Sequence, residues 1–192
     1  MVTWMREWAL ALVVLAGAGA AGCGYNTIQT YDEQVNAAAS QIKVQLQRRA
    51  DLIPNLVETV KGYAKQEQTV FTEVAEARAK LAGAVQSGDL QQMAQANAQL
   101  TAPLGRLLAI AENYPQLKSN ENFRALQDQL EGTENRIAVA RQDYNEAVNR
   151  YNAYIRRFPQ VLTAKVLGKG PRPYFEVETP GAAQAPKVDF SK

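Results

Sequence analysis

The chain has 192 residues, enough for one domain with a proper hydrophobic core. Its 21 basic and 19 acidic residues nearly cancel, so no strong overall charge would attract nucleic acid. The sequence contains no histidine and only one cysteine, Cys23. These counts exclude mechanisms that need an imidazole, an internal disulfide or a thiolate metal cluster.

The N-terminus predicts an export signal or a membrane anchor. Residues 8–22 form an uncharged run that is shorter than the roughly 20 apolar residues of a membrane-spanning helix. Small residues at positions 20–22 precede Cys23, which resembles a bacterial lipobox, although Ala20 stands where that pattern has a large aliphatic residue. We therefore predict a signal peptide over residues 1–22 with lipid attachment at Cys23. An uncleaved anchor helix is the alternative.

Both alternatives place the rest of the chain beside a membrane of the bacterial cell envelope, on its extracytoplasmic side. A single acyl chain binds membranes only marginally, so stable anchoring at Cys23 would need the several chains of a bacterial lipoprotein. If the cell has two membranes and Cys23 is lipidated, Gly24 in place of aspartate slightly favours the outer membrane, with the mature chain in the periplasm.

A first amphipathic stretch runs from Val35 to Leu81, with apolar residues spaced by three and four. Pro54 interrupts it, because proline lacks an N–H and disfavours helix at the preceding residue. We expect a break over residues 50–54 with Asp51 capping the second helix, although a continuous, kinked helix is the alternative. Arg49 and Glu67 occupy seam positions. We expect both side chains to reach solvent, whereas a buried polar pair that sets the register is the sharper alternative.

Two further helices are predicted. One runs from about Leu90 to Asn113, where Pro103 and Gly105 should bend or interrupt it. The last carries a heptad seam from Phe123 to Phe158, should be capped by Ser119 or Asn120, and should stop before Pro159. Its seam members are Phe123, Leu126, Leu130, Thr133, Ile137, Ala140, Tyr144, Ala147, Tyr151, Tyr154 and Phe158.

Short connections between amphipathic helices predict an all-α fold, an antiparallel up-and-down four-helix bundle over residues 23–165. Glycine and proline are frequent from residue 166 to residue 192, which predicts an extended, partly disordered tail. Within that tail we expect Tyr174 and Phe175 to dock partially on the bundle and residues 179–186 to be loose.

No residue pattern in the sequence indicates catalysis, a cofactor or a metal site. Tyr144 and Tyr151 are one heptad apart, and we interpret them as core residues with their hydroxyls at the rim. The carboxylates Glu131, Glu134, Asp143 and Glu146 lack the histidines of a di-iron bundle, so we interpret them as helix-surface charge. No glycine-rich phosphate loop or nucleophile–base pair is present.

Several segments resemble the LemA family. They include Gly24–Gln29 (GYNTIQ), the stretch from Arg48 to Lys80, the stretch from Glu112 to Asn152, and the ending from Pro173. The resemblance covers nearly the whole chain after Cys23. It implies a membrane-anchored helical bundle with no established catalytic residue or cofactor. Members of the family often occur near a membrane metalloprotease or TPM-domain envelope proteins, and one relative takes part in forming magnetosome membranes.

We therefore expect a non-catalytic, membrane-tethered scaffold that recruits an envelope protein, with a self-assembling membrane-organising protein, a homo-oligomer, as the alternative. A membrane metalloprotease or a TPM-domain protein is the expected partner, and nucleic acid is not. The residues that we propose for partner binding flank the expected break and the loop before the last helix. They are Arg48, Arg49, Asp51, Asn113, Tyr114 and Pro115.

Overall fold

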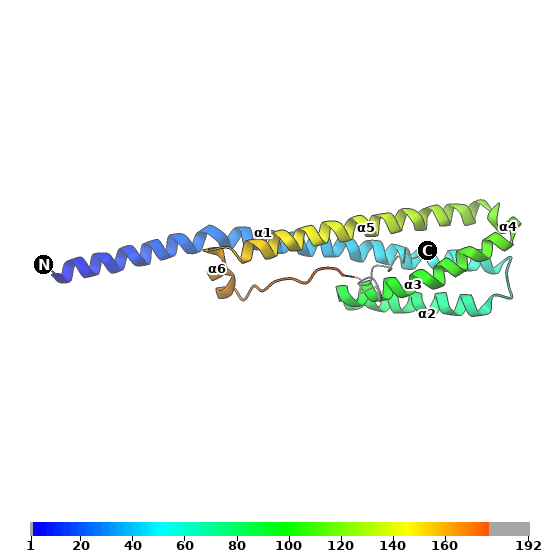
Figure 1. The fold of residues 1–192 in the computed structure, drawn as a ribbon, viewed down its shortest axis with the longest axis horizontal. Coiled ribbons are helices and arrows are strands. Elements are labelled where there is room, and N and C mark those ends of the chain that lie inside the picture. The colour runs from blue at the N-terminus through cyan, green and yellow to red at the C-terminus, as the bar shows by residue number, and fades with distance from the viewer. Residues whose placement is uncertain (1, 177–192) are drawn as a thin grey trace, which may run out of the picture. The chain divides into compact units, whose positions relative to one another are not determined.

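The structure is a computed structural model that describes residues 2–176, with side-chain environments from residue 24 onward. Its elements are α1 (Val2–Lys61), α2 (Gln68–Ser87), α3 (Leu90–Ile110), η1 (Ala111–Asn113), α4 (Pro115–Lys118), α5 (Glu121–Ile155) and α6 (Gln160–Val166) (Figure 1). No strand occurs among the described residues, so the predicted all-α class is confirmed. The short helices α4, which lies where a loop was expected, and α6 were not predicted.

The chain divides into two compact units, each described here by itself. The first unit takes the chain up to Ile42 together with Ala138–Tyr174, and therefore contains α6 and the ends of α1 and α5 that pack beside it. The second unit takes Lys43–Ile137 and the described residues from Phe175 onward, and therefore contains α2, α3 and α4.

The expected break at residues 50–54 is wrong, and the alternative of a continuous helix is confirmed. Helix α1 runs through Pro54 to Lys61, and Asp51 lies inside it rather than at a cap. Proline cannot donate the bond that would normally reach the carbonyl of Ala50, four residues earlier. The Nε–H of Arg78, on α2, donates to that carbonyl at 2.9 Å. A donor from another helix therefore replaces the missing one.

The actual break follows α1, where residues 62–67 turn before α2 begins at Gln68. Helix α2 ends at Ser87 and is capped by Gly88, whose positive φ of 75° suits a residue without Cβ. Asp89 then caps α3 by accepting from the backbone N–H groups of Gln91 and Gln92. Pro103 lies inside α3 and does not interrupt it.

The predicted seams are largely buried. On α1, Val35, Ile42, Leu46, Ile53, Leu56 and Val60 are buried. On α5, the seam is buried or half-buried from Phe123 to Tyr154. Asn120 accepts from the N–H of Phe123 at 3.0 Å, which confirms the predicted cap. Phe158 is the exception: α5 ends at Ile155, and the Phe158 side chain is 81% exposed. Fully burying one large apolar side chain stabilises a fold by roughly 1.5–3 kcal/mol, so these seams hold the helices together.

Several predictions fall on residues outside this description. The structure does not describe the side chain of Cys23 or those of the apolar run at residues 8–22, so lipid attachment stays a prediction. Residues 179–186, expected to be loose, also lie outside the described residues. Over the helices whose side chains are described, none is both long and apolar enough to cross a membrane.

Candidate functional site

An extended strap, residues 168–174, is fastened to the first unit by a buried carboxylate. Asp32 on α1 is only 6% exposed and accepts from Lys169 Nζ at 2.6 Å and from Arg172 Nη2 at 2.7 Å. Burial alone would raise the pKa of the Asp32 carboxyl, but hydrogen bonds and charge from Lys169 and Arg172 outweigh it and hold that pKa below its usual value. The strap is therefore locked to α1 while Asp32 is ionised.

Helix α5 holds the same strap through backbone groups. The side chain of Asn152 donates to the carbonyl of Arg172 at 2.9 Å and accepts from its N–H at 2.8 Å. The hydroxyl of Tyr144 donates to the carbonyl of Pro173 at 2.9 Å, and that of Tyr151 donates to the carbonyl of Gly170 at 3.2 Å. Burial raises the pKa of both tyrosines, which remain neutral donors. These side chains on α5 therefore satisfy backbone groups of the strap and hold it in place.

The prediction that the two tyrosines are core residues is confirmed, since both are buried, and their hydroxyls donate to carbonyls of the strap. The tail prediction is confirmed only for Phe175, which is 4% exposed. Tyr174 is 45% exposed, so its docking stays a prediction. The role of Asp32 was not predicted. The sequence does contain an indication of it. Residues 147–175 contain six basic residues and no acidic one, so a carboxylate that pairs with them has to come from another part of the chain.

The second unit contains a buried arginine. Arg49 is 4% exposed, and its Nη1 lies 2.6 Å from Asn97 Oδ1 on α3 and 2.6 Å from Glu134 Oε2 on α5. Burial lowers the pKa of Arg49, and the charge of Glu134 opposes that shift. The expectation that Arg49 reaches solvent is wrong. Its guanidinium is buried, and side-chain oxygens on α3 and α5 lie close enough to accept hydrogen bonds from it. Glu67, its expected companion, lies instead in the turn before α2.

A group of polar and aromatic side chains lies where α1 ends and α4 begins. We name it the turn cluster, and its members are Tyr63, Gln66, Tyr114, Pro115, Gln116 and Asn120. The amide of Gln66 donates to the hydroxyl of Tyr114, and the amide of Asn120 donates to the hydroxyl of Tyr63 at 3.1 Å. An open hollow of about 400 Å³ beside them is lined by Tyr63, Tyr114, Pro115 and Gln116. Hydrogen bonds between segments 48 and 57 residues apart therefore fix an exposed aromatic surface.

The proposed partner-binding residues separate into two groups. Asn113 and Pro115 are exposed and Tyr114 is half-buried, and Tyr114 and Pro115 line the hollow of the turn cluster. Arg48 and Asp51 are exposed on α1. Arg49 lies twelve residues before the end of α1, which is about 18 Å along a helix, and it is buried. The six proposed partner-binding residues therefore do not form one surface.

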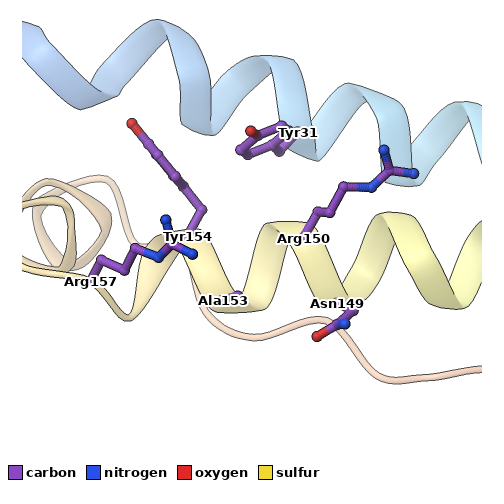
Figure 2. A pocket seen from close by; sticks show the side chains of 6 residues that line it. All are labelled: Tyr31, Asn149, Arg150, Ala153, Tyr154 and Arg157. Atoms are coloured by element: carbon purple, nitrogen blue, oxygen red, sulfur yellow. The ribbon is translucent and has the colours of Figure 1, made fainter.

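A smaller hollow of about 180 Å³ lies in the first unit and is both aromatic and basic (Figure 2). The rings of Tyr31 on α1 and Tyr154 on α5 meet edge to face, with centroids 5.2 Å apart. Arg150 and Arg157 line the same hollow. Arg150 is held by Glu146, 3.7 Å away, whereas Arg157 is exposed. This hollow could accept a small anion but has no group placed for covalent chemistry.

The side chains that the structure describes contain no cluster of three or more histidine, cysteine or acidic residues able to hold a metal ion. The carboxylates of Glu134 and Glu146 are instead paired with arginines.

Comparison with known proteins places the chain in a family. The LemA family profile matches residues 38–190. The chain is similar to magnetosome proteins MamQ 1 and MamQ 2 of Paramagnetospirillum magneticum (strain ATCC 700264 / AMB-1), with 29% identity over 82% of this chain. It is also similar to magnetosome protein MamQ of Magnetospirillum gryphiswaldense (strain DSM 6361 / JCM 21280 / NBRC 15271 / MSR-1), with 28% identity over 82% of this chain. In each case the match spans 66% of the relative's length. The chain therefore belongs to the LemA family.

Proposed function

We propose that this LemA-family protein is a non-catalytic scaffold, tethered to a membrane of the cell envelope by its N-terminus, that binds an envelope protein through the turn cluster. The observation that carries the proposal is that one helix joins the two functions. Helix α1 begins at Val2, includes the apolar run at residues 8–22 and ends at Lys61, two residues before Tyr63, so the proposed tether and the turn cluster belong to one continuous helical segment and its following turn.

The turn cluster has the character of a protein-binding surface. Tyrosine is enriched at interfaces because its ring buries apolar area while its hydroxyl keeps a polar partner. Tyr63 is 37% exposed, and its hydroxyl is already positioned by Asn120. A partner would therefore meet preorganised rings and would lose little side-chain entropy in ordering them.

The body that supports this surface is, in this proposal, the predicted antiparallel up-and-down four-helix bundle of α1, α2, α3 and α5. Two side chains of the second unit support that arrangement. Arg49 joins α1 to α3 and α5, and Arg78 joins α2 to α1. The partner that we propose, as expected from the sequence, is a membrane metalloprotease or a TPM-domain protein.

The test is site-specific photo-crosslinking of the full-length protein in living cells. A photoreactive residue at Gln116, in the turn cluster, should capture one discrete protein that mass spectrometry identifies. The same residue at Lys80, exposed on α2, is the matched control and should not capture it. Tyr114→Ala and Cys23→Ser should each reduce the capture, the first by removing the surface and the second by removing the lipid site.

Equal capture from both positions, or none from Gln116, would contradict the scaffold proposal. A ladder made only of this chain would support the alternative, a self-assembling membrane-organising protein. The similarity to proteins named for the magnetosome favours this self-assembly alternative.

A further inference from the structure

The corner between α5 and α6 exposes apolar and basic side chains together. Phe158 is 81% exposed, Leu162 is 55% exposed and Val166 is 87% exposed. Leu162 and Val166 are four residues apart and so lie on one face of α6. All three lie on α6 or within two residues of its start, and exposed apolar side chains that gather in one place mark an interaction site. With the basic residues Arg156, Arg157 and Lys165 they form what we name the corner surface.

No described residue neutralises the charge of the corner surface. Of the six basic residues between positions 147 and 175, Lys169 and Arg172 are bound to Asp32, and Arg150 is paired with Glu146. The other three, those of the corner surface, are exposed, and none forms an ion pair with a described residue. An acidic surface would therefore complement this one.

The start of α6 packs against α1 at Gly24. A Cβ placed on Gly24 would lie 3.2 Å from Cγ of Gln160, the first residue of α6, so only glycine allows this approach without a shift. Figure 1 shows α6 beside this part of α1. Gly24 directly follows Cys23 and the apolar run at residues 8–22. Whether Cys23 is lipidated or the run is an uncleaved anchor, Gly24 would then lie at the bilayer surface.

We infer that the corner surface binds the headgroups of anionic phospholipids, so that α6 lies on the bilayer into which the N-terminus is inserted. Phe158, Leu162 and Val166 would enter the boundary between headgroups and acyl chains, as the apolar face of an interfacial helix does. The three basic side chains would meet lipid phosphates, to which Lys and Arg are attracted near an anionic membrane. The inference rests on the membrane tethering in the proposed function and adds a second attachment to it.

The test uses full-length protein reconstituted with vesicles of phosphatidylcholine alone or of phosphatidylcholine mixed with phosphatidylglycerol. Flotation of the vesicles reports the tether, and hydrogen–deuterium exchange of the α6 amides reports docking of the corner. We expect flotation with both vesicles, and slower exchange in α6 only with phosphatidylglycerol. High salt should remove that protection, because it screens exposed charges.

Two pairs of variants test the two components. Arg156→Gln/Arg157→Gln should weaken the anionic-lipid protection of α6 by roughly tenfold or more. Phe158→Ser/Leu162→Ser should abolish it. The matched controls are Arg124→Gln/Arg136→Gln for charge and Val44→Ser/Val139→Ser for exposed apolar area, and they should leave it unchanged. Unchanged exchange of the α3 amides in every variant verifies that the fold is intact.

Each result decides between the two proposals. Flotation with equal α6 exchange in both vesicles overturns the corner inference and leaves the tether standing. Failure to float with either vesicle overturns the tether and the inference with it. Protection of α6 that rises with the protein-to-lipid ratio would show a second copy on the corner surface, and would overturn binding to lipid headgroups.

Discussion

One side chain of another helix supports α1 where Pro54 removes a helical hydrogen bond. The carbonyl of Ala50 lacks its normal helical donor because residue 54 is proline, and the Nε–H of Arg78 supplies a donor at 2.9 Å. Replacing Arg78 with methionine removes that donor while keeping an unbranched side chain. Replacing Pro54 with alanine restores the backbone N–H. The two substitutions should therefore be coupled energetically.

The magnitude follows from the burial of the acceptor. Ala50 is fully buried, so water cannot replace Arg78, and an unsatisfied buried carbonyl costs about 1–3 kcal/mol. Arg78→Met in the natural sequence should lower the free energy of unfolding by that amount. In a Pro54→Ala background the Ala50 carbonyl has its helical donor, so the same change should cost less than about 1 kcal/mol. The coupling energy should be roughly 1–2 kcal/mol.

The four proteins of this double-mutant cycle can be compared by urea unfolding in mild detergent, followed by far-UV circular dichroism. Arg106→Met provides the matched control. Arg106 pairs with Glu73 at 2.9 Å but is 57% exposed, so its loss should cost less than about 1 kcal/mol in either background.

The reasoning is refuted if Arg78→Met destabilises the protein equally whether residue 54 is proline or alanine. The bond to Ala50 would then contribute nothing specific to the proline, and the arginine would act only through its packing.

Two further predictions concern the buried polar groups. The pKa of Asp32 is lowered by folding, so its stabilisation is present above the unfolded value of about 3.9 and is lost as pH falls through the folded pKa. The protection factors of the strap amides should therefore fall as the pH drops below about 4, and Asp32→Asn should lower them at every pH; equal strap protection in the natural protein and in Asp32→Asn at neutral pH would contradict the lock. Arg49→Met should cost about 1–3 kcal/mol because Asn97 loses its buried partner, whereas Glu134→Gln, at a 53% exposed site, should cost less than about 1 kcal/mol. Urea unfolding measures both, and equal costs would show that the exposed carboxylate, not the buried amide, dominates.

The sequence by itself determined the helical class, the buried seams and the cap at Asn120. These features are local: apolar residues at spacings of three and four define one face of a helix, and an asparagine before the first turn satisfies a free N–H. The seam also kept its phase through Pro54, which favoured a continuous helix, but the proline rule alone favoured a break. Nothing within a few residues of Pro54 could decide between them.

Tertiary structure decided the questions that depend on distant partners. Arg78 bonds the carbonyl that Pro54 leaves without a helical donor, Asn97 bonds the buried Arg49, and the strap is bonded to a carboxylate 140 residues before Arg172. A buried polar group is stable only when a partner satisfies it, and packing alone brings such partners together. Spacing along the chain can therefore identify the face that a helix buries, but it cannot identify which distant group completes a charge or a carbonyl buried there.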